Sequence, residues 1–226
     1  ITMNKTERTE LLKRSKAQRL VRANASKTKN LWFNEKPEDF YLRCHADLTS
    51  QSYGIRIQEY IRSKAGLKHV SASKDRGDYE NKNGVFIENK INYKSVDGKY
   101  LFLQIRPWQR VGHFFITIDP DNDYAADYFY LTFDQIHAEL RQLGTYCHGT
   151  KKSIKNERRM YSIRFDEGSE AHTRWLAKYK LPSYEAAITK LKTVKRKYVF
   201  LNTELNKLAP TILFGKKEKN NLTNER

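Results

Sequence analysis

The sequence predicts an α/β fold in which a mixed central β-sheet is flanked by helices, with extra helices at both ends of the chain. Short runs of β-branched and aromatic residues alternate with segments of helical period, a pattern typical of such folds. The 226 residues, 38% of them hydrophobic, suffice for one core. We therefore expect a single domain over 1–226, divided into a basic helical N-terminal region (1–50), an α/β core (51–165), C-terminal helices (166–215) and a disordered tail (216–226).

The expected helices begin at residues that favour helix starts and end at residues that favour helix stops. Pro37 with two following acids suits a first turn, whereas Thr132 and Ser183 suit N-caps. Gly66 and Gly144 suit C-terminal stops. These signals and the apolar period together predict helices at 4–25, 37–48, 50–66, 132–144, 168–181 and 183–205.

The expected strands are short apolar runs bounded by turn residues. The run 99–106 is apolar on both faces, which is typical of a central strand. The stretch 146–159 lacks a clear period and is predicted to be a loop. The predicted strands are 69–73, 85–91, 99–106, 111–119, 128–131 and 160–165.

The strand around Glu88 carries two charges within an apolar run. Glu88 and Lys90 are two residues apart, so their side chains share one face of the strand. Charges in such a setting cost free energy unless they are paired or bind a ligand. Asp78 lies ten positions earlier, across a turn, and can fold back toward Glu88. Two carboxylates and a lysine suit metal-assisted hydrolysis of a phosphodiester. The alternative is an edge strand with a surface Glu–Lys pair.

The stretch 77–91 resembles the PD-(D/E)xK nuclease superfamily, in which an acidic turn precedes a hydrophobic run and a Glu-x-Lys step. The match covers Asp78, Glu88 and Lys90, with Gly77 in place of the proline of the motif. The resemblance implies a restriction-endonuclease-like core in a nuclease domain. It also implies that Asp78, Glu88 and the backbone carbonyl of Asn89 hold Mg²⁺, which Mn²⁺ can replace. Lys90 would then position the water that attacks the phosphate.

The same resemblance suggests two further site residues. In this superfamily a glutamate on the helix before the first acid often reaches the metal, and Glu59 lies on such a helix. Glu59 could equally be a surface residue. A glutamine on the strand after Glu-x-Lys sometimes lines the site, a role open to Gln104. The alternative for Gln104 is an amide hydrogen-bonded within the core.

The net charge of +17 predicts a polyanionic partner. With the resemblance, it implies a sequence-specific double-stranded DNA endonuclease, most like a type II restriction enzyme acting as a homodimer. A structure-directed, homing or repair nuclease, and a basic DNA-binding module without catalysis, remain alternatives. The basic loop after residue 146 is predicted either to contact DNA or to be an ordinary solvent loop. Its candidate DNA-contacting residues are His148, Thr150, Lys151, Lys152, Ser153, Lys155 and Asn156.

Several other classes of function have no support in the sequence. The chain contains no phosphate-binding G-x-x-x-x-G-K-[ST] loop and no G-x-G-x-x-G step after a strand, so we expect no nucleotide cofactor. No run of 18 apolar residues is present, so we expect no membrane association. The pairs Cys44-His45 and Cys147-His148 lack the spacing of a zinc site. Two distant cysteines indicate a reducing compartment, and we expect the protein to be cytoplasmic.

Overall fold

A computed structural model describes residues 4–13, 32–71, 76–147 and 159–195, which contain six helices and two β-sheets. The larger sheet has six strands in the order β1-β2-β3-β5-β6-β9. Strands β3 and β5 are parallel, and the other neighbouring pairs are antiparallel, so the predicted mixed central sheet is confirmed. Its strands are β1 (Lys68–His69), β2 (Tyr79–Glu80), β3 (Phe86–Tyr93), β5 (Gly112–Asp119), β6 (Ala125–Leu131) and β9 (Lys180–Leu181).

A second, antiparallel sheet has three strands in the order β4-β8-β7. They are β4 (Lys99–Ile105), β8 (Met160–Asp166) and β7 (Gly144–Cys147). The prediction that β4 is a central strand was wrong, because β4 is the edge of this smaller sheet. The side chains of Leu101 and Leu103 are 39% and 52% exposed, which accounts for its apolar residues on both faces. Tyr146 and Cys147, predicted as loop, belong to β7.

The helices begin where short-range signals predicted. Pro37 opens α3, and Gly66 ends α4 in the left-handed conformation. Thr132 caps α5 in a capping box with Gln135, and Ser183 caps α8. The six helices are α1 (Lys5–Leu12), α3 (Pro37–Asp47), α4 (Ser50–Ala65), α5 (Phe133–Leu143), α7 (Glu170–Tyr179) and α8 (Tyr184–Thr193).

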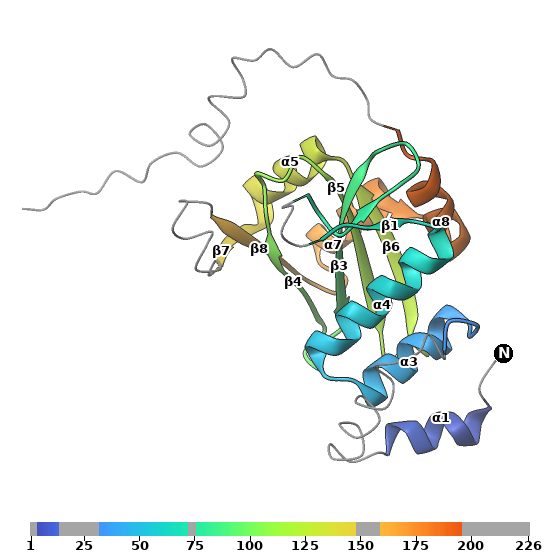
Figure 1. Ribbon diagram of the computed structural model, residues 1–226. Coiled ribbons are helices and arrows are strands. Elements are labelled where there is room, and N and C mark those ends of the chain that lie inside the picture. Colours follow the sequence, from blue (N-terminus) through green and yellow to red (C-terminus); the bar gives the residue numbers. More distant parts are fainter. Residues whose placement is uncertain (1–3, 14–31, 72–75, 148–158, 196–226) are drawn as a thin grey trace, which may run out of the picture.

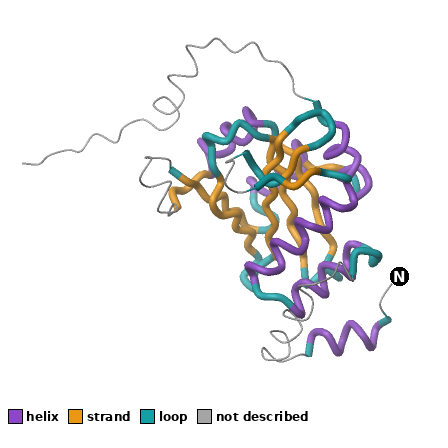
Figure 2. Tube along the Cα trace, viewed as in Figure 1, coloured by secondary structure: helices purple, strands orange, loops and turns teal. Residues whose placement is uncertain are grey.

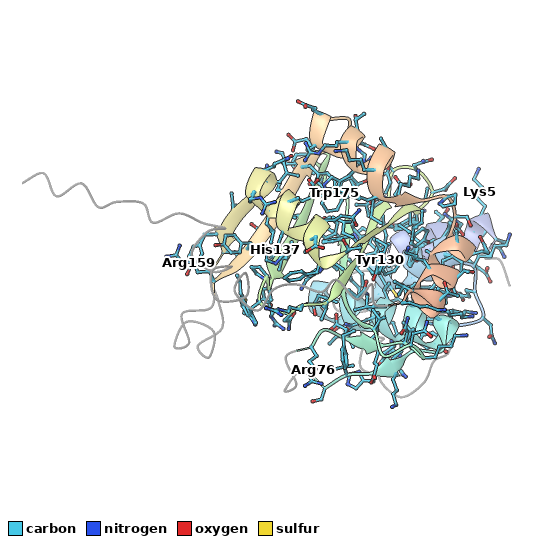
Figure 3. All side chains as sticks on the ribbon, turned by 90° about the horizontal axis from the view of Figure 1, so that it is seen from above. Lys5, Arg76, Tyr130, His137, Arg159 and Trp175 are labelled. Atoms are coloured by element: carbon cyan, nitrogen blue, oxygen red, sulfur yellow. The ribbon has the colours of Figure 1, made fainter. Side chains whose placement is uncertain are left out.

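The helices cover both faces of the larger sheet (Figures 1 and 2). One face packs against α3, α4 and α8, and the core there includes Phe40, Ile61 and Phe114. The other face packs against α5, α7 and the smaller sheet around the fully buried Trp175. In Figure 3 the sheet lies between the layer of α7 and the layer of α4. The apolar residues of β5 and β6 alternate between these two cores.

Two helices end earlier than predicted. Helix α8, predicted to reach residue 205, ends at Thr193, and residues 196–205 lie outside the described residues. Its last carbonyls accept hydrogen bonds from side chains of the turn after β2: Asn81 Nδ2 donates to Leu191 O (3.0 Å) and Val194 O (2.8 Å). Helix α1 ends at Leu12, and the rest of the predicted 4–25 helix lies largely outside the described residues. The predicted tail, 216–226, also lies outside them.

The N-terminal helix uses part of its basic character inside the molecule. Arg8 pairs with Asp39 of α3 at 2.7 Å, and Asp39 is almost fully buried. Arg8 also reaches Asp123 at 3.2 Å. Within the described ranges, none of the helices is long and apolar enough to cross a membrane.

Candidate active site

The turn before β2 holds Asp78 against β3. Gly77 has a φ of +80°, and a Cβ at this position would lie 2.8 Å from the carbonyl carbon and oxygen of Ile87. Only glycine therefore allows this close approach. The Asp78 N–H donates to Ile87 O (2.9 Å), and the Asn89 N–H donates to Asp78 Oδ2 (2.8 Å). The Asp78 carboxylate is thus fixed beside the segment that carries Glu88.

Glu88 and Lys90 form an ion pair on one face of β3. The Lys90 Nζ donates to Glu88 Oε1 at 2.8 Å, and the two side chains are only 15% and 5% exposed. This geometry differs from a surface Glu–Lys pair, which is solvated and contributes little. The face that carries the pair is the face that packs toward α5 and α7, because the flanking residues Ile87 and Ile91 point to the other face and pack into the opposite core.

The two carboxyl groups have pKa values displaced in opposite directions. Burial raises the pKa of Asp78 to about 6, and the nearby Glu88 charge adds to this shift. Burial also raises the pKa of Glu88, but the Lys90 ammonium outweighs it, so the pKa of Glu88 is lowered overall. Glu88 is therefore a carboxylate at neutral pH, whereas the negative charge on Asp78 is less favourable. Such divergence between neighbouring acids is common at functional sites.

His113 lies directly beside Glu88 on the neighbouring strand. Strands β3 and β5 are parallel with Glu88 opposite His113, so both side chains share one face. His113 is fully buried, and neither ring nitrogen has a hydrogen-bond partner of good geometry among the described residues. Burial lowers the pKa of His113 to about 4, although the Glu88 charge opposes the shift. A neutral imidazole therefore faces the ion pair.

Helix α4 reaches the site through Gln58. The Gln58 side chain hydrogen-bonds to Asp78 and favours its charged form. The Gln58 carbonyl also accepts from the Tyr79 hydroxyl at 2.8 Å. Glu59, the expected residue on this helix, is 42% exposed and pairs with Arg56 at 3.4 Å. A shift of one residue rotates a helical side chain by about 100°, which places Gln58 toward Asp78.

Gln104 is exposed on the edge strand β4. Its φ is +55°, and it lies where the pairing of β4 with β8 shifts register between Phe102 and Ile105. Its amide is therefore not buried in the core. The residue of this region that acts on the site is Arg106, whose charge helps to lower the pKa of Glu88.

The oxygen atoms around Asp78 suit a hard divalent cation, although the described residues contain no group of three or more His, Cys, Asp or Glu side chains placed to hold a metal. The candidate donors are two carboxylates and one backbone carbonyl. Since N–H and C=O of a strand residue point to the same side, the Asn89 carbonyl points toward Asp78, as its N–H does. Mg²⁺ binds such sets through a few protein oxygens and several waters. A cation would also offset the repulsion that raises the pKa of Asp78.

The predicted DNA-contacting residues after β7 lie outside the described residues, as does the rest of that loop (148–158). Three residues near the site were not predicted by the sequence analysis. Gln58 was not predicted because its acidic neighbour Glu59 was the expected site residue on this helix. His113 and Arg106 depend on the β3–β5 pairing, which joins residues 25 positions apart. The only local sign was a histidine at the start of an otherwise apolar strand.

Comparison with protein-family models and with curated protein sequences finds no match to this chain.

Proposed function

We propose that this protein is a Mg²⁺-dependent endonuclease of double-stranded DNA with PD-(D/E)xK chemistry. The observation that carries the proposal is the grouping of Asp78, Glu88 and Lys90, from two segments, at strand β3 of the larger sheet. Asp78 is held by the Asn89 N–H at 2.8 Å, and Lys90 is paired with Glu88 at 2.8 Å. The opposite pKa displacements of the two acids support a functional role.

Each residue has a distinct task in this proposal. Asp78, Glu88 and the Asn89 carbonyl would hold the cation, and Gln58 would orient Asp78. When bound, Mg²⁺ would acidify water and neutralise charge on the phosphate. Lys90 would orient the attacking water by a hydrogen bond. In-line attack on phosphorus would expel the 3′ oxygen and leave a 5′ phosphate. His113 would keep the site free of a further positive charge at neutral pH.

The fold is compatible with a restriction-endonuclease-like core. Helix α4, the β2–β3 hairpin and the parallel partner β5 surround the acidic residues on a mixed sheet. Parallel strands require a crossover of a dozen or more residues, usually a helix. Here β4 lies between β3 and β5 in the chain and joins the smaller sheet instead. The connection from β3 to the parallel strand β5 therefore runs through a strand of the smaller sheet instead of a helix.

The net charge of +17 supports a nucleic-acid substrate. A type II restriction enzyme acting as a cytoplasmic homodimer on a symmetric site is the form we favour. A structure-directed, homing or repair nuclease would use the same chemistry on other DNA. A basic DNA-binding module is the alternative without catalysis, and it is favoured by the finding that no three His, Cys, Asp or Glu side chains are placed to hold a metal within the described residues.

The test is incubation of supercoiled plasmid and phage DNA with the protein in Mg²⁺ or in EDTA. We expect discrete bands that require Mg²⁺ and that disappear in Glu88→Ala and Lys90→Ala, while both variants still bind DNA. The matched controls are Glu185→Ala and Lys178→Ala, which remove an exposed acid and an exposed lysine far from β3 in the chain. A smear or nicked circles would favour a repair or structure-directed nuclease.

Two results would contradict the proposal. Full activity of Lys90→Ala would overturn the assignment of the site. Binding by the unchanged protein without cleavage, on DNA of several sources and without modification, would favour the DNA-binding module.

A further inference from the structure

The turn between β4 and β5 is held by two hydrogen bonds. The Gln109 N–H donates to Arg106 O at 3.0 Å, which closes a four-residue turn with Pro107 at its second position. His137 Nε2 lies 2.9 Å from the carbonyl oxygen of Pro107. Because a carbonyl only accepts, His137 carries its proton on Nε2 and donates to Pro107. The turn is thereby fixed to α5 before any ligand binds.

Arg106 is the first residue of this turn. The Arg106 charge acts on Glu88 and lowers the pKa of its carboxyl, as Lys90 does more strongly. The Arg106 Nε is buried and has no hydrogen-bond partner among the described residues. A buried donor without a partner requires an explanation, and at a candidate site the simplest is a ligand. Guanidinium groups bind phosphate through two parallel hydrogen bonds, so a phosphate suits this position.

A second arginine borders the site from the side of β2. Arg76 immediately precedes Gly77 and Asp78, and its guanidinium carbon lies 5.5 Å from the centre of the Phe86 ring. Phe86 and Glu88 are two residues apart on β3, so Arg76 lies over the face that carries the ion pair. Figure 3 labels Arg76 on the segment that leads to β2 and His137, the anchor of the other turn, on α5. Arg76 and Arg106 together are called the arginine rim below.

The arginine rim gives the site an excess of positive charge. Asp78 and Glu88 contribute two negative charges, whereas Lys90 and the rim contribute three positive charges. A cation bound between the carboxylates would increase this excess. Such a site attracts a ligand with several negative charges rather than a single one. Successive phosphates of one nucleic-acid strand have this property.

We propose that the arginine rim binds the sugar–phosphate backbone of duplex DNA on either side of the phosphate that faces Asp78 and Glu88. This inference rests on the proposed function, since it assigns the substrate contacts of the same site. Phosphate contacts fix the position of a protein on DNA without reading its sequence. The rim therefore places the scissile phosphate for any DNA sequence, and selection among sequences belongs to other residues.

The test measures binding alone, so it does not depend on cleavage. A fluorescein-labelled DNA duplex is titrated with protein in EDTA over a series of salt concentrations, and the dissociation constant is read from fluorescence anisotropy. We expect Arg76→Ala and Arg106→Ala each to reduce the slope of log affinity against log salt by roughly one. Each substitution should also weaken binding by roughly tenfold at moderate salt. The matched control is Arg164→Ala, an exposed arginine on β8, which should change neither quantity.

A charge-preserving variant separates charge from geometry. Arg106→Lys should keep the salt slope but lose affinity, because an ammonium cannot form the two-pronged contact. This variant and Arg76→Ala carry the test if circular dichroism shows that Arg106→Ala does not fold. Unchanged slopes in the folded alanine variants, or an equal loss in Arg164→Ala, would overturn the proposal.

The outcomes separate this inference from the proposed function. Loss of slope in the rim variants, with no cleavage by the unchanged protein, would support the rim and contradict the nuclease. Cleavage by the unchanged protein, with normal slopes in the rim variants, would support the nuclease and contradict the rim. Absence of any binding to duplex DNA by the unchanged protein would contradict the rim directly.

Discussion

Two glutamates, Glu139 and Glu88, are both almost fully buried, yet their surroundings differ. Glu139 on α5 is 2% exposed, and both of its oxygens are used. Its Oε2 accepts from Arg174 (2.6 Å) and from Trp175 Nε1 (2.9 Å), and its Oε1 accepts from the Tyr179 hydroxyl (2.8 Å). Burial raises the pKa of Glu139, but these hydrogen bonds outweigh it and lower the pKa overall.

Glu88, 4% exposed, has a less complete environment. Lys90 pairs with the Oε1 atom of Glu88. The polar groups around Glu88 are less completely paired than those around Glu139. The pKa of Asp78 is raised to about 6, and the ring nitrogens of His113 lack partners of good geometry within the described ranges. A fully satisfied buried network stabilises one structure, whereas an incomplete one costs free energy unless a ligand completes it. The contrast separates a carboxylate that joins α5 to α7 from one that is available for binding.

The largest expected effect on stability is that of Glu139→Ala. Removing this carboxylate leaves Arg174 without its partner and leaves the Trp175 and Tyr179 donors buried. We expect a loss of about 3–5 kcal/mol in the free energy of unfolding, measured by urea denaturation. Glu88→Ala should cost clearly less, because Glu88 pairs with Lys90 alone, whereas Glu139 accepts from three donors. Glu139→Gln, which keeps one acceptor, serves as the control. Equal losses of stability in Glu139→Ala and Glu88→Ala would show that the two glutamates do not differ in this way.

A smaller decrease in the free energy of unfolding is expected at acidic pH. The pKa of His113 is about 4 in the folded protein and 6.5 in its ordinary range, so the unfolded chain binds the proton more readily between these values. The stability that neutral His113 supports is therefore present above pH 6.5 and is lost as the pH falls toward 4. The decrease in the free energy of unfolding should be on the order of 2–3 kcal/mol in metal-free buffer.

His113→Gln should flatten this pH dependence, because glutamine does not titrate. His137 and His172 also have lowered pKa values, caused mainly by burial, and would produce the residual slope. Chemical denaturation at several pH values measures both proteins. Identical slopes would show that the folded protein does not hold His113 in its neutral form.

The smallest effect is the stabilisation by Mg²⁺. A cation that binds only the folded protein should raise the free energy of unfolding by about 1.4 kcal/mol at ten times its dissociation constant. The increase should be absent in Asp78→Asn and present in Glu139→Gln, because only the first variant changes the proposed ligands. Thermal unfolding with and without Mg²⁺ measures it. An equal increase in both variants would place the cation elsewhere.

Features that depend on neighbouring residues in the chain were predictable. The starts of α3, α5 and α8 follow from Pro37, Thr132 and Ser183, whose effects act within one helical turn. The sharing of one face by Glu88 and Lys90 follows from the two-residue period of a strand. The mixed sheet with helices on both faces followed from the alternation of such segments.

Features that depend on distant contacts were not predictable. The end of α8 is set by Asn81, more than a hundred residues earlier, which binds the carbonyls of the last turn. The apolar composition of β4 is compatible with a central strand, but pairing with β8 places it at the edge of another sheet. The end of α8 and the position of β4 both depend on contacts that form only when the chain folds.

The sequence by itself determined the local geometry of the candidate site: a glycine turn, an acidic residue after it, and Glu88 with Lys90 on one strand face. Only the tertiary structure decided what surrounds these residues. The β3–β5 pairing placed His113 beside Glu88, the fold brought the charge of Arg106 to act on Glu88, and the rotation of α4 turned Gln58 rather than Glu59 toward Asp78. The physical reason is that side-chain period acts over a few residues, whereas burial, pairing and electrostatic shifts arise from contacts between remote segments.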